Sequence, residues 1–144
     1  MRRNLTAVAG SFVFLATPTL ACETVERTRS EMLTYQQDLA ARSDSIYLAR
    51  ATPLRGSYES IYRPVALIEG DKPPRSVRQW DSDCTSADDG IVVVFAQRVP
   101  ATYRLNDSWF WGGWALVAFS PREILDPKVA ASLRATSERL RLDK

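Results

Sequence analysis

Histidine is absent from this chain of 144 residues, and cysteine occurs only at Cys22 and Cys84. The lack of histidine excludes catalytic triads and dyads that use an imidazole base, and zinc sites that need an imidazole ligand. If the two cysteines pair with each other, no thiolate is left to act as a nucleophile or metal ligand. An enzyme of this composition would depend on carboxylates, lysine or tyrosine. The sequence therefore indicates no catalytic residue, metal site or other cofactor, and we do not expect an enzyme.

Net charge is also nearly absent, because 19 basic side chains stand against 17 acidic ones. Arg2 and Arg3 belong to an N-terminal segment described below, and without them the basic and acidic side chains are equal in number. A neutral domain has no overall electrostatic attraction for nucleic acid or for an anionic membrane. We therefore expect no nucleic-acid partner.

No hydrophobic run reaches the ~20 residues that a membrane-spanning helix needs. The apolar segment 5–16 is shorter, follows Arg2 and Arg3, and precedes small residues at Thr19 and Ala21. These are the positions that a signal peptidase reads. The pattern predicts a signal peptide that is cleaved after Ala21.

Cleavage at this position makes residues 1–21 the signal peptide and Cys22 the first residue of a periplasmic or secreted protein. Residues 22–144 are then one domain without a transmembrane segment. A lipid anchor on Cys22 is the alternative, although Thr19 and Leu20 stand in the opposite order to a lipoprotein signal.

The expected compartment determines whether the two cysteines are oxidised. In an oxidising environment a pair of cysteines favours one disulfide, here between Cys22 and Cys84. Closing a loop of that length stabilises a fold by about 4 kcal/mol in the chain-entropy model. Two separate buried thiols are the alternative.

The hydrophobic pattern predicts a helix, about five strands and a final helix. Thr28 and Gln36 interrupt the apolar stripe of the first helix, and Pro64 indicates an edge or a bulge in its strand. Ser120 and Glu123 form a capping box, and Asp126 followed by Pro127 repeats this helix-start signal. The expected helices cover 23–42 and the residues after 126, and the expected extended segments cover 45–51, 58–68, 73–80, 90–96 (the central strand), 103–105 and 109–119. The last two of these segments are expected to form a hairpin around residues 106–108.

Several of these features together resemble a known family. They are Cys22 at the expected mature N-terminus, the segments 43–51 and 65–70, Cys84 ahead of the strand 91–96, and the final segment 120–125. Their order resembles the netrin-like domain of tissue inhibitors of metalloproteinases and of small exported bacterial proteins. The resemblance implies an α+β, mostly β fold, with a five-stranded OB-type barrel flanked by an N-terminal and a C-terminal helix.

The same resemblance implies a second property, the inhibition of a metalloprotease through the amine and carbonyl of Cys22. Glu23 and Thr24 differ here from the family, which has a small residue and a second cysteine at those positions.

The densest aromatic cluster gives the candidate binding residues Trp109, Trp111 and Trp114. OB-type barrels bind oligosaccharides and oligonucleotides on their strand faces. Large aromatic side chains also fill protein cores, and that is the alternative for these three residues.

Four aspartates surround Cys84, and they do not have the spacing of a calcium-binding EF-hand. They are Asp81, Asp83, Asp88 and Asp89. We read them as an exposed acidic loop.

The expected function is that of a small exported binding or interaction module of the cell envelope, with a protein as its partner. A carbohydrate-binding module that uses the tryptophan cluster, a metalloprotease inhibitor that uses Cys22, and a periplasmic hydrolase that uses carboxylates are the alternatives.

Overall fold

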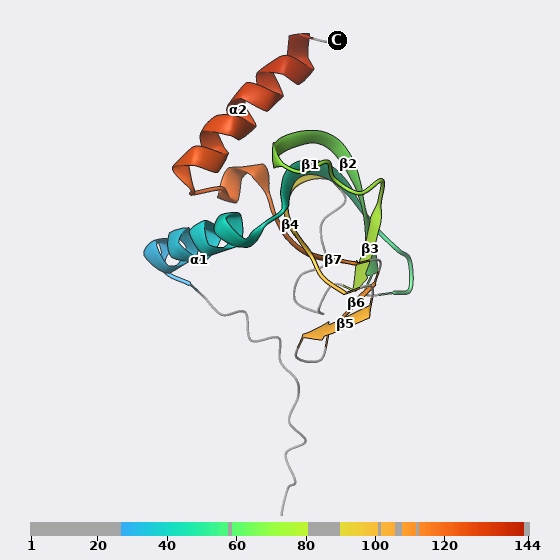
Figure 1. The fold of residues 1–144 in the computed structure, drawn as a ribbon. Helices are drawn as coiled ribbons and strands as arrows, with labels where there is room; N and C mark the ends of the chain where they lie inside the picture. Colours follow the sequence, from blue (N-terminus) through green and yellow to red (C-terminus); the bar gives the residue numbers. More distant parts are fainter. Residues whose placement is uncertain are drawn as a thin grey trace, which may run out of the picture.

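The computed structural model describes residues 27–57, 59–80, 90–100, 102–105, 108–111 and 113–142. These residues form an α+β fold that is mostly strand (Figure 1). The elements are α1 (Arg29–Arg42), β1 (Ser45–Pro53), β2 (Glu59–Gly70), β3 (Val77–Trp80), β4 (Gly90–Arg98), β5 (Thr102–Leu105), β6 (Ser108–Trp111), β7 (Trp114–Phe119), the 3-10 turn η1 (Pro121–Glu123) and α2 (Pro127–Leu142).

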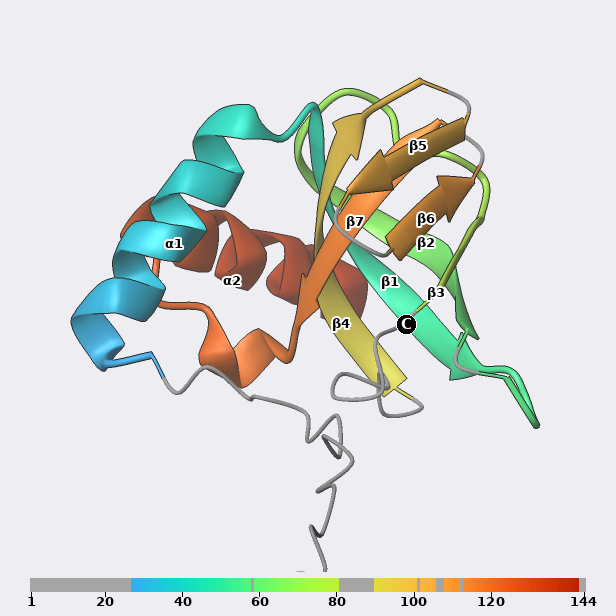
Figure 2. The same ribbon diagram turned by 90° about the horizontal axis from the view of Figure 1, so that it is seen from below.

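The strands form one antiparallel sheet in the order β5-β6-β3-β2-β1-β4-β7. Five neighbouring strands curl into a half-barrel, in the order β3-β2-β1-β4-β7. Figure 1 shows this half-barrel nearly end-on. The hairpin of β5 and β6 continues the sheet beyond β3. Both helices lie on one side of the strands (Figure 2).

The two rims of the half-barrel, β3 and β7, meet at Gln79 and Leu116. The side-chain Nε2 of Gln79 donates to the carbonyl of Leu116 at 2.9 Å, and the Leu116 N–H donates to Gln79 Oε1 at 2.8 Å. A side-chain amide has the same donor and acceptor as a peptide group. Gln79 therefore replaces a backbone pairing at this seam between β3 and β7.

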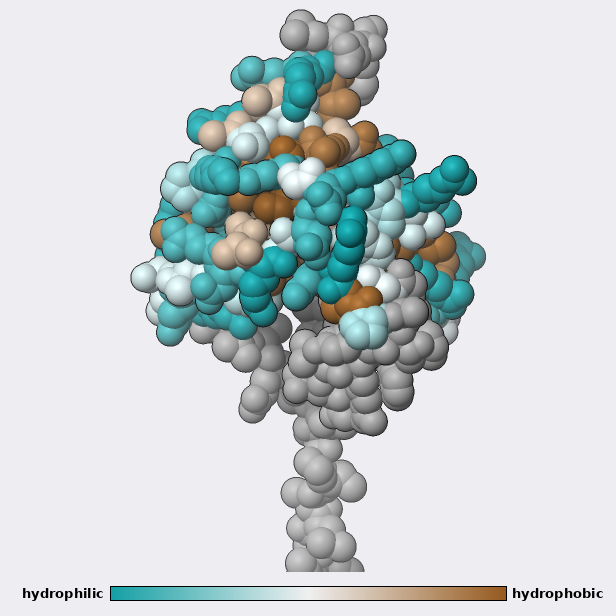
Figure 3. Space-filling view, in the orientation of Figure 1, coloured by the Kyte–Doolittle hydropathy of each residue, from teal (hydrophilic) through white to brown (hydrophobic). Residues whose placement is uncertain are grey.

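Strand alternation divides the core into two clusters. Tyr47, Ala49, Ala51, Tyr62, Val77, Val92, Val94, Ala96 and Leu116 fill the concave side of the strands. Ile46, Leu48, Val93 and Phe95 face the other way and pack against Leu39 of α1 and against Val129 and Leu133 of α2. In Figure 3 hydrophobic side chains show mainly along α2 and just below it. β4 supplies both clusters and lies between β1 and β7, so it is an internal strand covered on both faces, although β1 and not β4 is the middle strand of the half-barrel.

The first helix begins later than the sequence pattern predicts. Thr28 is its N-cap, with a capping box in which the Glu31 N–H donates to Thr28 Oγ1 and the Thr28 N–H donates to Glu31 Oε2. These hydrogen bonds hold the pKa of Glu31 below its usual value. Placing Thr28 inside the helix was therefore wrong, while residues 23–26 lie outside the described residues.

Gln36 is the second interruption of the apolar stripe, and it is fully buried. Its Nε2 donates to the carbonyl of Glu123 at 2.7 Å, while its Oε1 accepts from the N–H groups of Leu125 at 2.7 Å and Asp126 at 3.2 Å. A polar side chain in this position ties α1 to the connection between η1 and α2. Gln36, which interrupts the apolar stripe in the sequence, is thus hydrogen-bonded inside the fold.

The predicted helix-start signals in this connection are confirmed in part. Ser120 and Glu123 form the expected capping box, but the box opens the single turn η1 and not the long helix. The long helix α2 begins at Pro127, where Asp126 Oδ1 accepts the Val129 N–H at 2.8 Å. The Asp-Pro start signal at 126–127 is the one that begins α2.

Two strand predictions need correction. The expected strand 109–119 is two strands, which separate at Gly113, a residue with a φ of 79°. β6 pairs with β5 as the predicted hairpin, whereas β7 pairs with β4. Of the two predictions for Pro64, the bulge is confirmed. The edge strand is wrong, because β2 lies between β1 and β3. The missing N–H of Pro64 is tolerated because β3 pairs only with residues 59–62 of β2.

Candidate functional site

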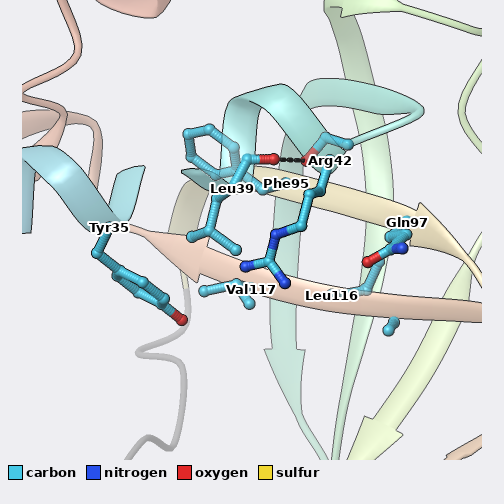
Figure 4. A pocket seen from close by; sticks show the side chains of 9 residues that line it. Tyr35, Leu39, Arg42, Phe95, Gln97, Leu116 and Val117 are labelled. Carbon is cyan, nitrogen blue, oxygen red and sulfur yellow. Dashed lines mark hydrogen bonds between the residues drawn. The ribbon is translucent and has the colours of Figure 1, made fainter. Parts of the chain in front are cut away.

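A groove between α1 and the outer face of β4 and β7 is the candidate site (Figure 4). Its cavity volume is about 160 Å³. The lining residues are Tyr35, Leu39, Arg42 and Ser43 from the helix side, Phe95 and Gln97 from β4, and Ala115, Leu116 and Val117 from β7. The groove thus lies where the C-terminal half of α1 passes over two paired strands.

The apolar floor of the groove is rigidly packed. Phe95 and Leu39 belong to the cluster between strands and helices, and Phe95 is 2% exposed. Phe119 makes edge-on ring contacts with Phe95 and with Tyr35, at centroid separations of 5.7 and 6.2 Å. The guanidinium of Arg27 lies 4.2 Å from the centroid of the Tyr35 ring and fixes its other side. The Tyr35 wall is therefore held in place from two sides.

Arg42 supplies the positive charge of the groove. Its side chain extends from the end of α1 toward Val117 (Figure 4). Its Nε donates to the carbonyl of Asp38 at 3.2 Å, and its terminal nitrogens have no hydrogen-bond or ion-pair partner among the described residues. The free end of this guanidinium is available to a carboxylate, which it matches in geometry.

The size of the groove limits its occupant. Pockets for cofactors and drug-sized ligands usually enclose roughly 300–1,000 Å³, whereas a cavity of about 150 Å³ holds a benzene-sized group. The groove therefore has room for a single apolar side chain. Gln97 and Ser43 add polar groups beside the Arg42 guanidinium, so the arrangement suits an apolar group that carries an acidic group next to it.

The predicted tryptophan cluster is divided between two strands. Trp109 and Trp111 lie on β6, where Arg104 and Thr102 of β5 are their cross-strand partners, and their side chains are outside the description. Trp114 lies on β7 and packs, half-buried, against the concave cluster. The three tryptophans therefore do not share one strand face.

Trp114 is covered by Arg98, its cross-strand partner, whose guanidinium lies 5.4 Å from the ring centroid. Arg98 is held by Asp71, at 3.0 Å from Nη2 to Oδ2, and its N–H donates to Asp44 Oδ2 at 2.6 Å. This corner also contains Gly70, where a Cβ atom would lie 2.4 Å from the carbonyl oxygen of Asp44. Trp114 thus takes part in packing at the end of the strands.

Cys22 and Cys84 lie outside the described residues, as do Asp81, Asp83, Asp88 and Asp89. Within the described ranges, no group of three or more cysteine or acidic side chains is placed to hold a metal ion. No helix in the described part of the chain is both long and apolar enough to cross a bilayer.

Two hydroxyl groups are buried on the concave side of the strands. Tyr47 Oη and Ser60 Oγ have no hydrogen-bond partner within the described ranges, and these residues are 0% and 1% exposed. Burial raises the pKa of Tyr47 well above its usual value of 10.0. A buried donor without a partner is a cost to stability, which the packing of the Tyr47 ring offsets.

The groove was not predicted from the sequence. Tyr35 and Leu39 lie on the apolar stripe of the first helix, a pattern that predicts packing against the domain, and Arg42 is the last residue of that helix. No signal in the sequence points to Arg42, because Asp38 stands four positions before it and predicts an ion pair on the helix surface, whereas in the structure Asp38 accepts from Arg42 only through its carbonyl.

Comparisons of the chain with models of protein families, with curated proteins and with solved structures find no match.

Proposed function

We propose that this chain is an exported binding module of the cell envelope, and that its groove between α1 and β7 holds one apolar side chain of a protein partner next to a carboxylate of that partner. The observation that carries the proposal is the free guanidinium of Arg42 over an apolar floor. A partner of opposite charge fits this site because no described residue forms an ion pair with this end of the exposed side chain.

The packing of the groove supports binding more than catalysis. Its floor and its Tyr35 wall are held by ring contacts, so little conformational entropy is lost when a side chain enters. Acid–base chemistry needs titratable groups with shifted pKa values in the site. In the groove, Arg42 and Tyr35 are the ionisable side chains, and neither is arranged with a second ionisable lining residue as an acid–base pair.

The strand arrangement supports the OB-type barrel that the netrin-like resemblance implies. β1, β2 and β3 are consecutive antiparallel neighbours, β4 pairs with β1, and β7 pairs with β4 and meets β3 at Gln79. An OB-type barrel is a partly open barrel of five strands, and the order of these five strands, with the β5–β6 hairpin as an insertion, supports that proposal. On this proposal the groove lies outside the barrel and is separate from the metalloprotease-inhibiting N-terminus that the family uses.

The test is an NMR titration with two probes that differ only in charge, N-acetyl-leucine and N-acetyl-leucinamide. We expect N-acetyl-leucine to shift the amide signals of Gln97, Leu116 and Val117, and to bind more tightly than the uncharged amide. Arg42 is exposed, and an exposed ion pair contributes about 0.2–1 kcal/mol, which corresponds to a preference of up to about fivefold.

Two variants of α1 complete this test. Arg42→Gln should abolish the preference for the charged probe, whereas Arg29→Gln removes the same charge from an exposed position of the same helix and should leave it unchanged. Equal binding of both probes, or a preference that persists in Arg42→Gln, would show that the groove is not a carboxylate-binding site.

A further inference from the structure

The outer surface of β1 to β4 continues beyond the helices as a small exposed area. We call it the arginine face, and its members are Arg50, Ile61, Arg63, Arg78 and Ile91. The strand register places Arg63, Arg50 and Ile91 side by side across β2, β1 and β4, and places Arg78 of β3 opposite Ile61 of β2. The arginine face lies on the same side of β1 as Ile46 and Leu48, which the helices cover.

Two like charges are directly opposed on this face. Arg50 of β1 and Arg63 of β2 are cross-strand partners, and directly opposed residues have Cβ atoms roughly 4.5–5.5 Å apart. Both side chains are exposed, and neither has a hydrogen-bond or ion-pair partner within the described ranges. Opposed like charges destabilise a strand pair, so this arrangement is a local cost to the fold that an anionic partner would relieve.

Arg78, the third arginine, has a partner in Glu59. Both Nε and Nη2 of Arg78 donate to Glu59 Oε2, and this contact holds the pKa of Glu59 below its usual value. The Arg78 side chain is nevertheless 61% exposed. Among the described side chains of this face, one acidic group therefore stands against three arginines, so that these side chains carry a net positive charge.

Aliphatic side chains lie beside these charges. Ile91 is 39% exposed, and Val65, which follows Arg63 on β2 after one residue, is 47% exposed. Single-stranded nucleic acids are held by a basic groove together with stacking on aromatic rings, and no aromatic ring is among the described side chains of the arginine face. Arginine and exposed aliphatic side chains on one surface are instead typical of a protein that lies against anionic lipid headgroups.

We propose that the arginine face docks the protein on the anionic surface of a lipid bilayer, with Arg50 and Arg63 against the lipid phosphates and Ile91 at the boundary of the acyl chains. The binding is peripheral. It is independent of the groove between α1 and β7, because the two sites share no residue.

The test is co-sedimentation with vesicles of phosphatidylcholine alone and of phosphatidylcholine mixed with phosphatidylglycerol. The protein is produced from the whole chain, and its N-terminus is recorded by intact mass so that all variants are compared in the same form. We expect binding to the anionic vesicles only, weakened by salt. Arg50→Gln/Arg63→Gln should reduce the binding constant by about tenfold or more, from the usual contribution of a basic residue near such a surface, and Ile91→Ser should reduce it further.

The matched control is Arg134→Gln/Arg141→Gln, which removes the same charge from exposed positions of α2. It should bind nearly as the unchanged protein does, and Arg42→Gln should also keep its vesicle binding. Equal losses in the two double variants, with both folded by circular dichroism, would overturn the proposal in favour of a net-charge effect. Binding of a single-stranded oligonucleotide that matches vesicle binding and is lost in the same variant would overturn it in favour of nucleic acid.

Discussion

Replacing Gln36 by alanine tests whether one buried amide fixes the position of the two helices. The substitution removes three hydrogen bonds to the connection between η1 and α2, and it leaves the Glu123 carbonyl and the N–H groups of Leu125 and Asp126 without that partner. Each buried polar group that loses its partner costs about 1–3 kcal/mol. Water can reach part of this connection, so we expect a total loss of about 3 kcal/mol in the free energy of unfolding.

The measurement is urea denaturation, with thermal denaturation as a second probe. A loss of about 3 kcal/mol lowers the thermal midpoint of a domain of this size by roughly 8–15 °C. Gln37→Ala is the matched control, because Gln37 is the neighbouring glutamine on the same helix and is exposed. If Gln36→Ala unfolds at the same urea concentration as Gln37→Ala, the reasoning about the buried amide is refuted.

A conservative variant separates the hydrogen bonds from the packing. Gln36→Glu keeps the shape and the two accepting contacts, but the carboxylate faces the carbonyl of Glu123 in place of the Nε2 donor. Protonation restores a donor to the side chain. The loss of stability in Gln36→Glu should therefore be smaller at acidic pH than at neutral pH, when each is compared with the unchanged protein at the same pH. A loss that is independent of pH would assign the effect to packing alone.

Three further predictions concern other parts of the chain. Gly70→Ala should lower the free energy of unfolding by more than about 2 kcal/mol, because the new Cβ would lie 2.4 Å from the carbonyl oxygen of Asp44 at a φ of 87°; a urea midpoint equal to that of the unchanged protein would contradict this. Tyr47→Phe should leave stability at neutral pH unchanged or raised, since it removes a buried hydroxyl without a partner in the described part. Because burial raises the pKa of Tyr47, the folded protein keeps this side chain neutral, and above about pH 10 the free energy of unfolding falls as the pH rises. The free energy of unfolding of Tyr47→Phe should therefore fall less steeply with pH in alkaline solution than that of the unchanged protein. Equal slopes for the two proteins would contradict this. Cys22 and Cys84 should be joined, so thiol titration of the unreduced protein should find no free thiol, and two reactive thiols would exclude the disulfide.

The sequence predicted those parts of the fold that depend on local hydrophobic pattern. The internal strand β4 was found because residues 92–96 are apolar on both faces, and the start of α2 was found because Asp126 and Pro127 carry a strong helix-start signal. The division of 109–119 at Gly113 was missed, because the aromatic pattern continues across the break and only long-range pairing with β4 shows that a new strand begins.

Polar residues inside the fold were the harder part to predict. Gln36 and Gln79 look like surface glutamines in the sequence, and their partners lie 87–90 and 37 positions away in the chain. The groove was missed for the same reason, since Arg42 and Val117 come together only when α1 is placed across β7. Contacts between segments that are far apart in the chain cannot be predicted from the residue spacing within one segment.

The seam at Gln79 has a consequence for the motions of the protein. The Leu116 N–H is bonded to a side chain that can rotate, and not to a neighbouring strand. Rotation of the Gln79 amide therefore frees this one N–H while the ladder between β4 and β7 stays intact. Hydrogen exchange at Leu116, compared with exchange at Val117 on the same strand, would report how often β3 and β7 separate. A rim joined in this way can open and close without unfolding any strand.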